Sequence, residues 1–101
     1  MQIRITTRKL SFNKAIDASI RSRVAAVFAQ FAKTVRAVRV LLSDRNGRRG
    51  GGDKRCRIEV DLLAGGRVVG EEVRADIRAA VIRAMDRAVH AMRRQSRAAA
   101  M

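Results

Sequence analysis

The stretch 55-RCRIEVDLLAGGRVV-69 contains the most regular strand pattern of the chain and the turn that follows it. From residue 55 to residue 62 charged and apolar side chains alternate, which is the period of a strand with one buried face. The two glycines that follow suit a tight turn, so residues 67–75 are predicted to return as the second strand of a hairpin. The valines of this second strand fall at both odd and even positions, so a regular strand would place them on both faces. We therefore expect a β-bulge near Gly70.

The N-terminal half has the pattern of a strand, a helix and a second strand. Apolar residues alternate with others in residues 2–7 and again in residues 35–43, so both segments are predicted strands. Between them, apolar residues follow helical spacing from Ser11 or Asn13, either of which can cap the first turn, to about Lys33. A strand, a helix and a strand of these lengths imply a right-handed crossover between two parallel strands.

The last helix is predicted to begin after Asp76, whose side chain can cap it, and to run to about Arg97, with residues 98–101 as a frayed tail. The element order is then β-α-β-β-β-α. One four-stranded sheet with two helices packed on one face would bury the apolar stripes of both helices. We therefore expect a single α+β domain over residues 1–101, similar in architecture to a double-stranded-RNA-binding domain.

Residues 44–53 interrupt these patterns with glycines, arginines and aspartates. The glycines raise backbone entropy and the segment offers nothing to bury, so we predict a mobile basic loop. Two interpretations remain open at this point. The loop is a solvated connector, or it is a flexible arm that contacts phosphates through Arg45, Arg48 and Arg49.

A row of cations follows the predicted last helix on the side opposite to its apolar stripe. The row consists of Arg83, Arg87, His90, Arg94 and Arg97. The helix lacks the glutamates one turn away that would balance this charge, and the chain carries 23 Lys plus Arg against 9 Asp plus Glu. The resulting formal charge of +14 favours a polyanionic partner, and ribosomal RNA, other RNA, DNA and an anionic membrane all remain open here. Trp and Tyr are absent, so we expect arginine contacts to phosphates rather than base stacking.

The residue pattern supports neither a catalytic site nor a metal site. His90 is the only histidine of the chain and lies among cations, where it is a poor general base. Cys56 has no second cysteine to pair with, and its inward position in the strand predicts a buried structural thiol. We therefore expect no enzyme activity, no cofactor, no metal and no small-molecule substrate.

The sequence also indicates the cellular compartment of the protein. No segment approaches the roughly 20 consecutive apolar residues that cross a bilayer, and the N-terminus lacks the pattern of a signal peptide. A single cysteine fits a reducing compartment. We expect a cytoplasmic protein that has no membrane partner and is a monomer when free.

Several segments, taken in order, carry a family resemblance. They are residues 1–10, the helix after Asn13, Leu42-Ser43-Asp44, residues 56–62, Gly65-Gly66, residues 75–81 and Met85-Asp86-Arg87. Together they resemble the short hibernation promoting factors, the ribosome-associated translation inhibitor family of bacteria and plastids. The resemblance implies a protein that binds ribosomal RNA of the small subunit, in the channel between head and body, and blocks translation by occupancy. The chain resembles the short class of the family, without the second domain of longer relatives.

The resemblance also implies roles for single residues. An RNA-facing role passes most directly to Arg83, Arg87 and Arg94, which the cation row contains independently. The same role passes less directly to Arg8, Lys9, Arg21 and Arg23. The chain departs from the family where Arg78 replaces an aromatic residue and where apolar Ile82 and Val89 replace acids.

Two other classes of function remain open. One is a general structured-RNA or DNA binding protein, because double-stranded-RNA-binding domains also set two helices against a sheet. The other is an interaction protein in which exposed Ile82 and Val89 form a self-association patch. Competition with naked duplex would identify the first class, and a stable dimer without nucleic acid would identify the second.

Overall fold

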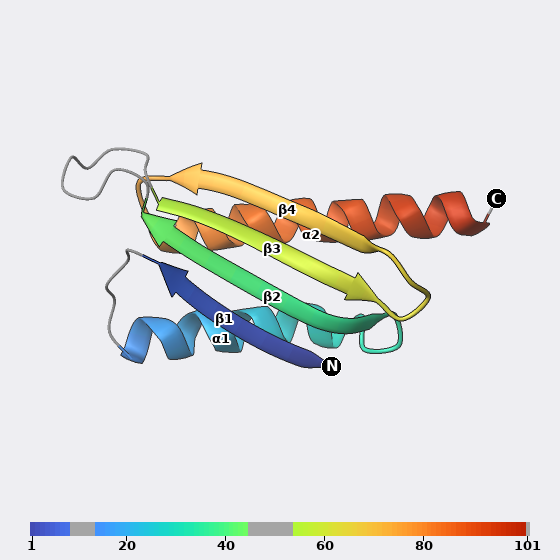
Figure 1. The fold of residues 1–101 in the computed structure, drawn as a ribbon, viewed down its shortest axis with the longest axis horizontal. Helices are drawn as coiled ribbons and strands as arrows, with labels where there is room; N and C mark the ends of the chain where they lie inside the picture. The colour runs from blue at the N-terminus through green and yellow to red at the C-terminus, as the bar shows by residue number, and fades with distance from the viewer. Residues whose placement is uncertain (9–13, 45–53, 101) are drawn as a thin grey trace.

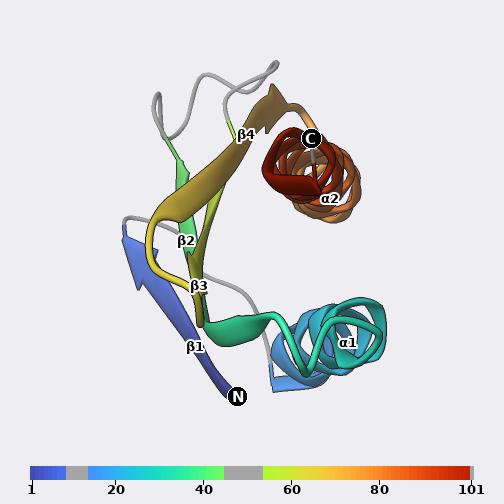
Figure 2. The same ribbon diagram turned by 90° about the vertical axis from the view of Figure 1, so that its right-hand side faces the viewer.

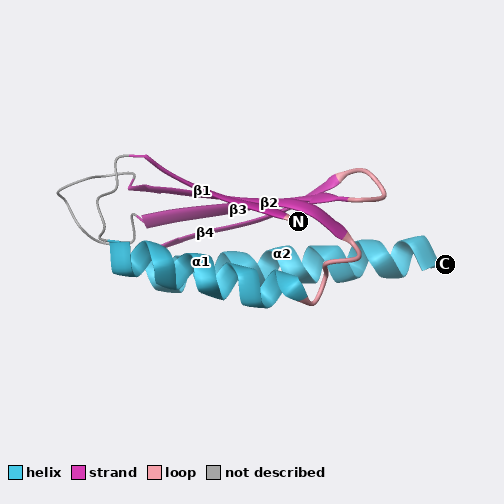
Figure 3. Cartoon of the chain, turned by 90° about the horizontal axis from the view of Figure 1, so that it is seen from below, coloured by secondary structure: helices cyan, strands magenta, loops and turns pink. Residues whose placement is uncertain are grey.

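Four strands form one sheet, and two helices cover a single face of it (Figures 1 and 2). The computed structural model describes residues 1–8, 14–44 and 54–100, with side chains described as far as Gln95. The elements are β1 (Gln2–Arg8), α1 (Lys14–Ala29), β2 (Val35–Asp44), β3 (Lys54–Leu62), β4 (Arg67–Arg74) and α2 (Ile77–Ala100). Figure 3 shows both helices on the same side of the strands, with no helix on the other side. The predicted α+β architecture and element order are confirmed.

The strand order is β1-β2-β3-β4, so β1 and β4 are the edges of the sheet. β1 pairs with β2 in parallel, and the two remaining pairs are antiparallel. The parallel pair follows from the connection, because the chain crosses over through α1 before it returns as β2. The hairpin between β3 and β4 turns at Gly65 and Gly66, which have φ angles of 101° and 87° that favour glycine.

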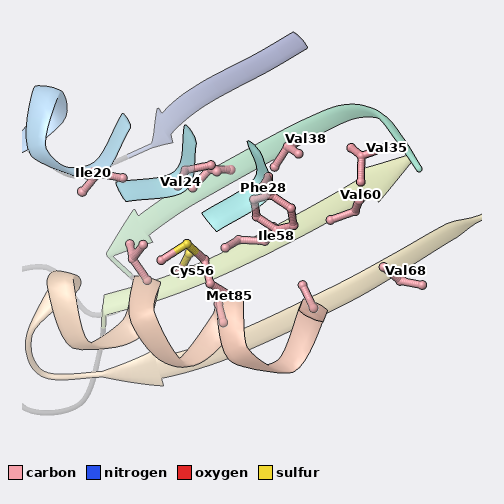
Figure 4. Close-up of a cluster of buried hydrophobic side chains, with 14 of the residues drawn as sticks. Ile20, Val24, Phe28, Val35, Val38, Cys56, Ile58, Val60, Val68 and Met85 are labelled. Atoms are coloured by element: carbon pink, nitrogen blue, oxygen red, sulfur yellow. The ribbon is translucent and has the colours of Figure 1, made fainter. Parts of the chain in front are cut away.

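The core lies between the sheet and the two helices. Alternate residues of the three strands β2 to β4 point toward it, and the buried residues of α1 are Ile20, Val24 and Phe28. Figure 4 shows Phe28 projecting from α1 into the space above β2 and β3. Cys56 is fully buried in this core, and burial raises the pKa of its thiol to about 12, with a smaller contribution from the charge of Glu71. The predicted buried structural thiol is confirmed.

The predicted β-bulge near Gly70 is wrong. The pairing of β3 with β4 runs without a shift from Asp61 and Arg67 to Lys54 and Arg74. The shift in the sheet lies instead at the start of β2, next to Ala37. The valines of β4 therefore lie on both faces of a regular strand, and the position of α2 explains why.

Gly70 lies on the helix-facing side of β4 and is buried against the backbone of α2. A Cβ atom at this position would collide with the carbonyl oxygen of Ala84 and would lie 2.6 Å from the amide nitrogen of Ala88. The inward position is thus filled by the helix itself, and Val69 on the neighbouring outward position is partly exposed. A glycine here permits close approach of two backbones rather than a bulge.

Several element boundaries differ from the sequence predictions by one to four residues. α1 ends at Ala29 instead of near Lys33, because the chain turns there: the amides of Thr34 and Val35 donate to the carbonyl of Phe31 at 2.8 and 2.9 Å. Asp44 is the last residue of β2 rather than the start of a loop, and the rest of the predicted loop lies outside the described residues. α2 continues to Ala100, three residues beyond the predicted end.

The cap of α2 is confirmed. The Asp76 carboxylate accepts a hydrogen bond from the amide of Arg78 at 3.2 Å, and the carbonyl of Asp76 accepts one from the amide of Ala80. The expected caps of α1, Ser11 and Asn13, lie outside the described residues.

The bare face of the sheet carries a network of ion pairs. Three carboxylates, Glu59, Asp61 and Glu71, are shared among four arginines, which are Arg39, Arg55, Arg57 and Arg67. The pKa of each carboxyl is lowered, chiefly by a hydrogen bond from one arginine: from Arg57 to Glu59, from Arg67 to Asp61 and from Arg55 to Glu71. Cross-strand pairs of this kind hold neighbouring strands in register.

Replacement of Gly70 by alanine should destabilise the protein strongly, because the added methyl group must displace the backbone of α2. We expect the free energy of unfolding to fall by about 3 kcal/mol, as in other overpacked sites. Urea denaturation of G70A measures the loss. V69A, a change on the exposed side of the same strand, should cost less than about 1 kcal/mol. Equal stability of G70A and the parent would show that the helix does not depend on this contact.

The ion pairs of the bare face should make stability depend on acid pH. A carboxyl whose folded pKa is lowered stabilises the fold above its unfolded pKa of about 4, and this contribution is lost as the pH falls through the folded pKa. E59Q should therefore be less stable than the parent at pH 7, by about 1 kcal/mol because the arginine partners are partly exposed to water. Urea denaturation of both proteins from pH 7 to the acid limit of folding should show the difference shrinking. A constant difference would contradict the lowered pKa.

Candidate nucleic-acid interface

The described members of the predicted cation row lie together along one groove. Four of them, Arg83, Arg87, His90 and Arg94, line an open groove of about 590 Å³ between α2 and the edge strand β4. Their helical spacing places them beside the buried stripe of α2, so packing of that stripe on the sheet fixes where they project. The described cations of the row, which were predicted from helical spacing alone, therefore form one continuous surface in the folded protein.

β4 contributes both charges and apolar surface to the same groove. Its lining residues are Val69, Glu71, Glu72 and Arg74, and Asp86 of α2 completes the wall. Arg74 is not among the site residues predicted from the sequence. Arg74 lies two residues after Glu72, so both side chains are on the helix-facing side of β4. The sequence pattern does not show that β4 is an edge strand, and it is this edge position that exposes Arg74 to the groove.

Two arginines of the groove share one carboxylate. Arg87 Nε donates to Glu72 Oε2 at 2.8 Å, and Arg74 Nε lies 3.4 Å from the other oxygen of the same carboxylate. The hydrogen bond from Arg87 is the main reason that the pKa of Glu72 is lowered. The acid that balances Arg87 therefore comes from a strand and not from the helix.

The other cations of the groove remain available. Among the described residues, Arg83, His90 and Arg94 have no carboxylate partner. All three are exposed, so their donors face water in the absence of a partner. A phosphate oxygen can therefore take these donors without breaking an internal ion pair.

The two faces of the molecule differ in how their positive charge is compensated. On the bare face most described arginines share the carboxylates of the ion-pair network. On the helices, Arg87 is the one described cation with a carboxylate partner. The helical cations that lack such a partner within the described residues are Lys14, Arg21, Arg23, Arg78, Arg83, Arg93 and Arg94. Uncompensated positive charge therefore accumulates on the helix side.

A second groove runs between the two helices and joins the first at Asp86 and His90, which line both. Its volume is about 330 Å³, and its cationic lining includes Arg23 of α1 and Arg93 of α2. Arg23 is thus brought near the cation row, and the RNA-facing role that the resemblance implies for it stays a prediction. Arg93 was missed, although it follows His90 by three residues and so lies on an adjacent face of the helix.

Ile82 and Val89 both lie in the groove between the helices. Ile82 is 39% exposed, whereas Val89 is half-buried and packs against the core. The predicted exposure is therefore confirmed for Ile82 and wrong for Val89, and self-association through this pair stays a prediction.

The remaining predicted site residues are dispersed. Arg21 is exposed on α1, apart from both grooves. Arg8 ends β1 and lines a hollow on the bare face of the sheet, so it lies on the opposite side of the sheet from the cation row. Lys9 and the side chain of Arg97 lie outside the described residues.

This arrangement can bind anions, chiefly through the guanidinium groups of its arginines. In the part of the chain that the structure describes, no group of three or more His, Cys, Asp or Glu side chains is placed to hold a metal ion. No described helix is both long enough and apolar enough to span a membrane.

Comparisons with known proteins agree with the fold. A sequence model of the family described as sigma 54 modulation protein / S30EA ribosomal protein matches residues 3–99. The chain is similar to the Protein Y N-terminal domain of Thermus thermophilus, with 32% identity and a TM-score of 0.66 over 86% of this chain and 90% of that one. It is also similar in fold to a ribosomal subunit interface protein from Coxiella burnetii, with 15% identity and a TM-score of 0.72 over 100% of both chains. No curated protein sequence matches the chain.

The ion pair between Arg87 and Glu72 can be tested by titration. R87Q removes the main cause of the lowered pKa, so the pKa of Glu72 should rise toward its ordinary value. R83Q removes the same charge from a residue without that contact and should change the pKa much less. Carboxyl ¹³C NMR during an acid titration measures both. Equal shifts in the two variants would mean that Glu72 senses only the general field of the groove.

Proposed function

The chain belongs to the family of sigma 54 modulation proteins and S30EA ribosomal proteins, and on this premise we propose that it is a ribosome-associated translation inhibitor, a hibernation factor. Its partner is ribosomal RNA of the small subunit, and its place is the channel that messenger and transfer RNA use. It acts in the cytoplasm, as a monomer when free, and without enzymatic chemistry. Inhibition is steric, because the bound protein occupies the channel.

The observation that carries this proposal is the uncompensated charge of the helices. The helix-side arginines of α2 line an open groove, whereas the arginines of the bare face are largely bound to carboxylates. Phosphates that replace the counterions of the helix side release those ions, and this release supplies affinity that depends strongly on salt.

The shape of the molecule supports occupancy as the mechanism. Its extents are 48 × 23 × 17 Å, so it is an elongated body with α2 along its length. The 24 residues of α2 extend over about 36 Å at 1.5 Å per residue. A rigid rod with cations along one side suits a channel lined by phosphates.

Charge reversal within the groove tests the proposal. R83E/R94E changes two arginines that have no carboxylate partner among the described residues, so the fold should remain intact. We expect binding to small ribosomal subunits to weaken by about 100-fold or more, since each reversal adds repulsion to a lost phosphate contact. Co-sedimentation with purified subunits at several salt concentrations measures this loss, and circular dichroism reports the fold.

The matched control is R4E/R36E, which makes the same change in charge at exposed strand residues outside the groove. It should bind much more tightly than R83E/R94E. Equal losses in both variants would refute the groove as the binding surface. Failure of the parent protein to bind subunits at any salt concentration would refute ribosome binding itself, and equal affinity for naked RNA duplex would favour a general RNA-binding protein.

A further inference from the structure

A hollow on the bare face of the sheet gathers three arginines and two hydroxyl groups. Its polar lining consists of Thr6, Arg8, Ser43, Arg55 and Arg57, and its volume is about 230 Å³. It lies on the side of the sheet that carries no helix (Figure 3), and none of its lining residues lines either of the grooves described above.

The strand register brings these side chains together. Arg8, Ser43 and Arg55 are paired across β1, β2 and β3 in one row of the sheet. Thr6 and Arg57 belong to the adjacent row on the same face. Neighbouring strands lie about 4.8 Å apart, so donors from three strands converge on one small area.

A single carboxylate orients two of the arginines. Glu71 Oε2 accepts hydrogen bonds from Arg55 Nη2 at 2.7 Å and from Arg57 Nη1 at 3.2 Å. Arg57 Nε donates in turn to Glu59 at 3.0 Å. The two guanidinium groups are therefore held in place before any ligand arrives, which lowers the entropy lost on binding.

The hollow has more donors than acceptors. Arg55 Nε is buried and donates to no acceptor among the described residues. Arg8 is exposed and has no carboxylate partner among them. A buried N–H group without an acceptor is unfavourable, and an anion that reaches it would satisfy it.

We propose that this hollow binds one phosphate group. Arg55 can keep its Nη2 contact with Glu71 while its Nε donates to a phosphate oxygen, and Arg8 and the hydroxyls of Thr6 and Ser43 complete the shell. The phosphate belongs to an RNA backbone or to a free phosphate compound, since both offer the same oxygens. The protein then has anion-binding surfaces on both faces of its sheet.

A titration of the isolated protein tests the site without ribosomes. Inorganic phosphate and pyrophosphate are added in chloride buffer, and the arginine Nε–H signals are followed by ¹⁵N NMR. The Arg55 signal should shift and saturate, because its Nε–H gains an acceptor. The absence of a saturable shift at this signal would overturn the proposal.

Two variants of the same strand provide the matched comparison. R8Q removes a cation of the hollow, and R4Q removes one from an exposed position of β1 outside it. R8Q should weaken phosphate binding about fivefold, which corresponds to the loss of one charge-assisted contact, whereas R4Q should change it less than about twofold. Equal weakening in both variants would mean that phosphate binding depends only on the net charge of the protein, and this would refute a defined site.

Binding of the same variants to small ribosomal subunits identifies the source of the phosphate. If RNA supplies it, R8Q should lower the slope of log affinity against log salt by about one unit relative to R4Q. If a free phosphate compound supplies it, the two variants should bind subunits alike while still differing in the phosphate titration. Because the titration needs no ribosome, failure of ribosome binding would not be mistaken for failure of this site.

Discussion

The backbone of α2 rests directly on Gly70 of β4, and the positions of the cations in the α2 groove follow from that contact. No side chain separates strand and helix at this point, since a Cβ atom would meet the backbone of Ala84 and Ala88. The small buried residues of α2 extend the same close packing along the helix. A helix held this tightly to an edge strand presents its outward arginines at a fixed distance from the charges of that strand.

The same geometry sorts the charge of the protein between two faces. The bare face of the sheet brings acidic and basic residues of neighbouring strands opposite one another, so its arginines are mostly engaged. The helices have few acids among their described residues, and their cations meet a carboxylate only where α2 passes Glu72. A chain with a net charge of +14 therefore concentrates its uncompensated charge on one side. This asymmetry gives a polyanion a preferred side from which to approach.

Glu72 shows how an acid can orient one arginine of the α2 groove without engaging all of them. It fixes the direction of Arg87 through a 2.8 Å hydrogen bond and leaves Arg83 and Arg94 without an acid partner among the described residues. Glu71, its neighbour in sequence, points to the other face and performs the same task for Arg55 and Arg57. Two adjacent glutamates on an edge strand thus orient arginines on opposite sides of one sheet. Orientation of this kind reduces the entropy that a ligand must offset on binding.

The sequence by itself determined the element order, the inward residues of the regular strands, the cap at Asp76 and the row of helical cations, because each depends on local spacing. It did not determine the end of α1, the role of Gly70 or the partners of the arginines. Those features depend on contacts between elements that are distant in the chain, such as Arg87 with Glu72, and hydrophobic periodicity carries no information about which elements meet. The tertiary structure alone decided which cations are compensated and which are free to bind, because compensation is a property of proximity in space and not of order in sequence.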